Sequence, residues 1–239
     1  MKNIEEEGDI IPLDKRIIFA LDVDSPKEAK DWVLLLEGQI TFFKVGLELF
    51  LAGGFEIVDW IINRDLDVML DLKLYDVPRT VQSAIRQIDK YCPTFTTVHG
   101  DQAIMEAAAS AAENTEILAV TVLTSLDQND LQDLGMSTDT KSLVMKRTQQ
   151  SIDAGLGGVV CSGQEVSNLR NKLGNGFYTV VPGIRSKHQA KEDQKRTVTA
   201  AEAFRSGADH IVVGSLIRNA EDPNKEAEDL LDDINDIFY

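Results

Sequence analysis

Eight short apolar runs recur along the chain, and they constrain its fold more than any other feature. They are rich in β-branched and aromatic residues, which favour strands. Continuous apolar runs of this length are typical of strands buried on both faces, as in parallel sheets. The runs are Ile17–Leu21, Phe42–Val45, Val68–Lys73, Thr96–His99, Leu118–Leu123, Gly158–Cys161, Tyr178–Val181 and Ile211–Val213.

The segments between these runs carry helical signals. Val58, Ile61 and Ile62 share one face of a predicted helix, and Ser25 before Pro26 is a typical helix start. A strand followed by a helix, repeated eight times, predicts an α/β fold of the (β/α)8 TIM-barrel class. A doubly wound open sheet is the alternative, but no Gly-x-Gly-x-x-Gly motif follows the first run.

Length and composition fit one enzyme-sized domain. We expect a single domain over residues 1–239, with the barrel at about 16–223 and acidic tails at both ends. The formal net charge of −16 argues against nucleic acid as a partner, because phosphate binding needs a basic face. No signal peptide or bilayer-spanning stretch is visible, so no membrane partner is expected. Cys92 and Cys161 are interpreted as reduced thiols of a cytoplasmic protein.

The third run ends in an unusual group of charges. Because residues two apart on a strand share a face, Asp71 and Lys73 should point the same way, with Asp76 beyond the strand end. Pro78 then suits the first turn of a helix. A solvated strand face is the simpler interpretation, but the neighbouring residues are typical of a fully buried strand.

Ionisable or polar residues also follow several other runs. In a barrel, the carboxyl ends of the strands meet at one rim, where catalytic groups lie. A set with several Lys and Asp residues on one rim predicts a charge network around a ligand. The set is Asp22, Lys44, Asp71, Lys73, Asp76, His99, Thr124 and Arg185.

Two members of this set indicate the chemistry. Lys73 lies between two carboxylates, which favour its charged form, so it suits a proton donor or an electrostatic anchor better than a Schiff-base nucleophile. His99 is interpreted as a packed or rim residue, because no His, Asp or Glu group has metal-ligand spacing. We therefore predict no metal site and no organic cofactor.

The last two runs end in features of a phosphate site. Gly183 and Arg185 follow the seventh run, and Gly214 and Ser215 lead from the eighth into a helix whose N–H groups can hold an anion. Phosphate sites at this place are common in barrels. The simpler alternative for Gly214 is that it only turns a strand into a helix.

The pattern Asp71-x-Lys73-x-x-Asp76-Val77-Pro78-x-Thr80 resembles the signature of the orotidine 5′-phosphate decarboxylase family. Related sugar-phosphate decarboxylases keep the Asp-x-Lys-x-x-Asp but not the Pro-x-Thr. The resemblance runs from about residue 16 to 223 and also covers these segments: Ala20–Asp22, Phe43–Gly46, Leu123–Ser125, Pro182–Arg185, Asp193–Gln194 and Val212–Gly214. It implies a metal- and cofactor-independent carboxy-lyase that converts orotidine 5′-phosphate to UMP in de novo pyrimidine biosynthesis.

The resemblance also implies roles for the matching residues. Lys73 would protonate C6 of the pyrimidine as CO₂ departs, with Asp71 beside the substrate carboxylate. Lys44 would bridge the aspartates Asp71 and Asp76 and, with Asp22, hold ribose hydroxyls. Thr124 would contact the pyrimidine. The phosphate would be bound by Arg185, Gln194 and the backbone at Gly214.

A homodimer with shared active sites is a further implication, because Asp76 and Thr80 cross into the neighbouring subunit's site in this family. One position departs from the pattern: Ser215 stands where the family usually has an arginine that binds phosphate. A serine hydroxyl and helix N–H groups can still bind phosphate, but one charge-assisted contact is missing. Arg218, one turn on, is a candidate to reach back.

Two rival functions stay open at this point. The first is a barrel decarboxylase or aldolase acting on a sugar phosphate such as 3-keto-gulonate 6-phosphate, usually with Mg²⁺, which a chelator would inhibit. The second is a non-catalytic barrel that senses a nucleotide, which would bind UMP tightly without turnover.

Overall fold

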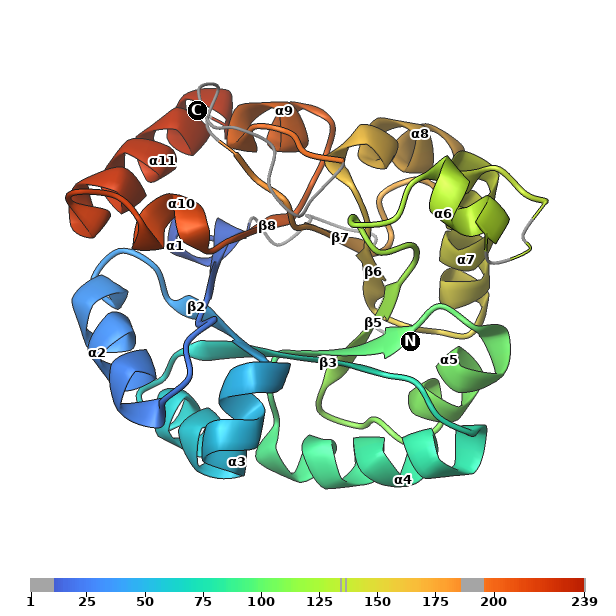
Figure 1. Cartoon of the computed structure of the whole chain (residues 1–239), viewed down its shortest axis with the longest axis horizontal. Coiled ribbons are helices and arrows are strands. Elements are labelled where there is room, and N and C mark those ends of the chain that lie inside the picture. Colours follow the sequence, from blue (N-terminus) through green and yellow to red (C-terminus); the bar gives the residue numbers. More distant parts are fainter. Residues whose placement is uncertain (1–10, 134, 136, 186–195, 239) are drawn as a thin grey trace.

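A computed structural model describes residues 11–133, 135, 137–185 and 196–238. Its parallel strands form one closed barrel in chain order, so that β1 pairs with both β2 and β8, and helices surround the barrel (Figure 1). All eight predicted strands and the (β/α)8 barrel class are confirmed. The strands are β1 Ile17–Ala20, β2 Phe42–Gly46, β3 Asp67–Leu74, β4 Phe95–His99, β5 Glu116–Val120, β6 Gly158–Val160, β7 Tyr178–Val181 and β8 His210–Val213.

The connections supply the outer ring of helices. Ser25 begins α2 as predicted, because its side chain accepts a hydrogen bond from the Glu28 N–H and Pro26 occupies the first turn. The helices are α1 Leu13–Arg16, α2 Pro26–Leu36, α3 Leu47–Ile62, α4 Pro78–Ile88, the 3-10 helix η1 Asp89–Tyr91, α5 Gln102–Ala109, α6 Gln128–Asp133, α7 Thr140–Asp153, α8 Gly163–Leu173, α9 Ala200–Arg205, α10 Ser215–Arg218 and α11 Pro223–Phe238.

Strand alternation builds two apolar layers. Phe42, Met69 and Phe95 belong to a cluster that fills the barrel interior, and side chains of the opposite strand faces pack between the barrel and the helices. The barrel is therefore a packed core and not a pore. Within the described residues, the open cavity of the barrel lies above this packing, at one rim.

The segment that we expected to be an acidic C-terminal tail forms helix α11. Its apolar face buries Ala227, Leu230 and Ile234, while its acidic residues lie mainly on the other face. The expected N-terminal tail, residues 1–10, lies outside the described residues. Among the described helices, none has the length and apolar character required to cross a membrane.

Candidate active site

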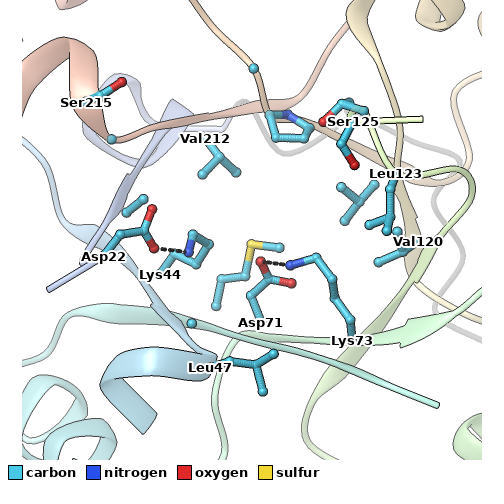
Figure 2. Close-up of a pocket in the computed structure, with 18 of the residues that line it drawn as sticks. Asp22, Lys44, Leu47, Asp71, Lys73, Val120, Leu123, Ser125, Val212 and Ser215 are labelled. Atoms are coloured by element: carbon cyan, nitrogen blue, oxygen red, sulfur yellow. Dashed lines mark hydrogen bonds and ion pairs between the residues drawn. The ribbon is translucent and has the colours of Figure 1, made fainter. Parts of the chain in front are cut away.

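A cavity of about 580 Å³ opens at the carboxyl-terminal rim of the barrel. Figure 2 shows two ion pairs along one wall, with Ser215 beyond Asp22 and with Leu123 and Ser125 beyond Lys73. The rim thus brings together most of the predicted set. The predicted residues that line the cavity are Asp22, Lys44, Asp71, Lys73, Thr124, Arg185, Gly214 and Ser215.

The first ion pair joins the ends of β1 and β2. The Lys44 ammonium lies 2.7 Å from the Asp22 carboxylate, and the Lys44 side chain is 10% exposed. Gly46 provides the space for this pair, because a Cβ at residue 46 would lie 3.0 Å from the Lys44 Nζ. Gly46 lies in the segment Phe43–Gly46 of the family resemblance, but no role in the site was predicted for it from the sequence.

The second ion pair lies at the end of β3. The Lys73 ammonium is 2.6 Å from Asp71 Oδ2, and the buried Thr97 hydroxyl donates to Asp71 Oδ1 at 2.9 Å. The same Thr97 oxygen accepts from the Lys73 backbone N–H at 2.9 Å. Thr97 therefore positions both members of the pair. Sequence reasoning missed it, because a threonine inside an apolar run is also an ordinary strand former.

Lys73 has a strained backbone. Its φ of +48° lies in the left-handed region, and the pairing of β3 with β4 shifts register between Leu70 and Leu74. For a residue with a Cβ this conformation costs about 1–3 kcal/mol, and it persists only where the surroundings enforce it. Such strain is concentrated at functional sites, and the strained Lys73 lines the rim cavity.

Asp71 stays ionised in spite of its burial. Burial alone raises the pKa of this carboxyl, but the charges of Lys44 and Lys73 and the hydrogen bonds from Lys73 and Thr97 hold the pKa below its ordinary value. Two ammonium groups thus stabilise one buried carboxylate. The result is an electrostatically fixed array in which Lys73 retains N–H donors for a ligand.

The remaining wall combines apolar and anion-binding groups. Val120 and Leu123 supply apolar surface, whereas Arg185 and Arg218 bring two guanidinium groups to the cavity. Cys161 also lines it, but burial raises the pKa of its thiol to about 12, so it is not a thiolate nucleophile near neutral pH. The described residues contain no group of three His, Cys, Asp or Glu side chains that could hold a metal ion.

Three predicted residues do not line the cavity of their own chain. Asp76 and Thr80 are exposed, and the Asp76 carboxylate accepts from the Val77 N–H. His99 packs its ring 4.8 Å from that of Tyr75, and burial, followed by the charge of Arg147, lowers its pKa. Gln194 lies outside the described residues.

The sequence and the structure are similar to known proteins. The family model described as "Orotidine 5'-phosphate decarboxylase / HUMPS family" matches residues 15–230. An orotidine 5'-phosphate decarboxylase of Methylococcus capsulatus is 47% identical over 95% of both chains, and that of Methylacidiphilum infernorum is 43% identical over 94% of this chain and 100% of its own.

A solved structure agrees with these relatives. The crystal structure of orotidine 5'-phosphate decarboxylase from Lactobacillus acidophilus superposes with a TM-score of 0.81 at 29% identity, and covers 92% of this chain and 99% of its own. Both the sequence match and the fold extend over nearly the whole barrel. The chain therefore belongs to the orotidine 5'-phosphate decarboxylase / HUMPS family.

Proposed function

We propose that this chain decarboxylates orotidine 5′-phosphate to UMP, the activity named for its relatives and a step of pyrimidine biosynthesis. One observation carries the proposal: the Lys73 ammonium, fixed 2.6 Å from a buried carboxylate, faces a rim cavity in a member of this family. The proposal includes a cytoplasmic location, which the two free cysteines fit.

Lys73 carries the proton-transfer step of this proposal. The bond between C6 and the carboxylate breaks, CO₂ leaves, and the electron pair remains on C6. A proton from the Lys73 ammonium then forms the new C6–H bond, and solvent returns a proton to the amine. An ammonium already oriented towards C6 stabilises the developing charge without reorganisation, and the nearby apolar surface of Val120 and Leu123 strengthens the effect.

Asp71 and Lys44 have a supporting role. Asp71 holds the Lys73 ammonium in place and lies where the substrate carboxylate would approach, so that the departure of CO₂ relieves a repulsion between two negative charges. Lys44 balances the charge of Asp71 and, with Asp22, offers polar groups to the ribose hydroxyls. Thr124 would contact the pyrimidine, and Arg185, Gly214 and Ser215 would bind the phosphate, with Gln194 as a further ligand.

The reaction needs no metal or organic cofactor in this proposal. The decisive assay follows the near-UV absorbance of orotidine 5′-phosphate as it becomes UMP, with and without EDTA. We expect turnover that EDTA does not change. Turnover of 3-keto-gulonate 6-phosphate that requires Mg²⁺ would support the sugar-phosphate alternative, and tight UMP binding without turnover would support a sensor.

The active unit in this proposal is a homodimer with shared sites. Asp76 and Thr80 are exposed, and large apolar side chains near them are exposed as well, with Tyr75 at 67% and Val77 at 63%. Leu47 and Leu51, at the start of the neighbouring helix α3, are 55% and 82% exposed. Exposed apolar residues around two polar side chains that do not line their own chain's cavity are typical of a surface that a second subunit covers.

Hybrid dimers test the sharing of the site. Lys73→Ala and Asp76→Ala chains, each nearly inactive alone, are mixed, unfolded and refolded together. If Asp76 serves the partner's cavity, each hybrid contains one fully intact site, and activity recovers to about a quarter of that of the wild-type protein for random two-fold pairing. No recovery in a mixture shown to contain hybrids would contradict the shared site.

A further inference from the structure

The cationic side chains of the cavity fall into two classes. Lys44 and Lys73 each form an ion pair with an aspartate. Arg185 and Arg218 instead donate to backbone carbonyl oxygens, those of Ile184 at 3.0 Å and of Asp22 at 2.8 Å. Within the described part of the chain, these two guanidinium groups are thus the cavity cations that no carboxylate neutralises. A dianionic ligand group would bind where they lie.

The short turn between β8 and α10 directs Arg218 to the cavity. Gly214 packs closely against β1, because a Cβ at residue 214 would lie 3.2 Å from the Cβ of Ala20. Ser215 and Arg218 are three residues apart on α10, so they share a face, and both line the cavity. The Arg218 guanidinium uses one of its N–H donors for the Asp22 carbonyl and retains the others for a ligand.

We propose that Arg218 supplies the second cation for the substrate phosphate, a role that Ser215 cannot fill because its hydroxyl is neutral. This proposal rests on the proposed function and adds Arg218 to the phosphate-binding residues given there. A guanidinium group matches phosphate oxygens with two parallel N–H donors, which makes the contact strong and directional. Arg185 and Arg218 then bind the phosphate from two strand ends, those of β7 and β8.

The contact with Asp22 suggests a second, purely structural role for Arg218, and the experiment must separate the two. If Arg218 only positions the end of β1, its loss weakens every ligand that uses Asp22, with or without a phosphate. If Arg218 binds phosphate, its loss weakens only phosphorylated ligands. UMP and uridine differ in this group alone and therefore form the matched pair of probes.

The experiment measures the dissociation constants of UMP and uridine by calorimetry for the wild-type chain and for Arg218→Ala. We expect UMP to bind about 10- to 100-fold more weakly to the variant, as for the loss of one charge-assisted contact, while uridine binding changes by less than about twofold. Arg205→Ala, which removes an exposed arginine of α9, is the control for net charge and should leave both constants unchanged.

A second variant completes the test. Adding Ser215→Arg to Arg218→Ala restores a guanidinium group one turn earlier on the same helix face, and we expect it to recover at least about a tenfold part of the UMP affinity. Equal losses for UMP and uridine, or no loss for UMP, would overturn the proposal. The binding constants require no turnover, so a chain that fails to decarboxylate orotidine 5′-phosphate would contradict the proposed function without deciding the role of Arg218.

Discussion

Each end of strand β3 has an aspartate that pairs with a lysine and accepts a hydrogen bond from a threonine hydroxyl, but the surroundings of the two ends differ. At its start, Asp67 lies 2.7 Å from the Lys15 ammonium and accepts from the Thr94 hydroxyl at 2.6 Å. At its other end, Asp71 has Lys73 and Thr97 as the corresponding partners. The side chain of Asp67 is 23% exposed, whereas that of Asp71 is 9% exposed and faces a cavity.

The difference separates a surface ion pair from the ion pair of the proposed active site. The pair at the start of β3 is solvated and contributes at most about 1 kcal/mol to stability, as surface ion pairs do. The pair at the other end is buried, needs a second lysine, Lys44, to balance its charge, and contains a strained residue, Lys73. Burial of charge and strain both reduce stability. Their combination at one rim fits the proposed active site, where a fixed charge is worth that loss of stability.

The largest effect is expected when Lys73 is compared with Lys15, the lysine that pairs with Asp67 at the start of β3. In the proposed mechanism, Lys73→Ala removes the proton donor and the charge next to C6, and we expect the rate of decarboxylation to fall by about 1,000-fold or more. Lys15→Ala breaks the matching pair at the start of β3 and should leave the rate within about twofold. Steady-state kinetics with orotidine 5′-phosphate decide the matter, and a similar rate for both variants would remove Lys73 from the mechanism.

The two threonines give the next contrast. Thr97→Val leaves the Lys73 backbone N–H without its acceptor and removes a donor to Asp71, so we expect about 1–3 kcal/mol lower stability and a rate reduced by about tenfold or more. Thr94→Val should cost about 1 kcal/mol and leave the rate unchanged. Urea unfolding and kinetics measure both quantities. Equal rates would show that Thr97 has no positioning role.

A smaller effect is expected from two glycines near opposite rims. Gly46→Ala places a Cβ 3.0 Å from the Lys44 Nζ, so the ammonium must move away from Asp22. We expect activity to fall by several-fold, which corresponds to roughly 1 kcal/mol of transition-state stabilisation. The free energy of unfolding should change little. Gly38→Ala, in the connection before β2, meets no atom within 4 Å and serves as the control. A fully active Gly46→Ala chain would show that the Lys44–Asp22 geometry does not matter.

The smallest effect is a pH dependence of stability. The pKa of Asp71 is lower in the folded chain than in the unfolded chain, where it is about 3.9. The ionised carboxylate therefore contributes fully to the free energy of unfolding above that pH. This contribution is lost as the pH falls through the folded pKa. The difference in unfolding free energy between wild type and Asp71→Asn should be constant above about pH 5 and shift against the wild type on further acidification. A difference that stays constant down to pH 3 would contradict the lowered pKa.

The sequence predicted the barrel and most of its rim for a physical reason. Buried parallel strands need continuous apolar runs, and charges that directly follow such runs, as Asp22 and Asp71 do, must lie at the strand ends. Thr97 was beyond this reasoning, because its contacts with Asp71 and Lys73 occur where the β3–β4 pairing shifts register, which no local sequence pattern records. The helical fold of residues 223–238 was hidden by their acidic composition, although apolar residues recur there at helical spacing.

The pairing of β1 with β8 has a consequence for how the protein is made. Ile17 of β1 pairs with Ile211 of β8, so the ring cannot close on a ribosome until β8 has emerged, after the other seven strands. The Arg218 guanidinium and the Asp22 carbonyl oxygen, on opposite sides of this seam, then come together. A cavity with walls on both sides of this seam is thus completed only after β8 has paired with β1, and a product that ends before β8 would expose the unpaired edge of β1 to aggregation.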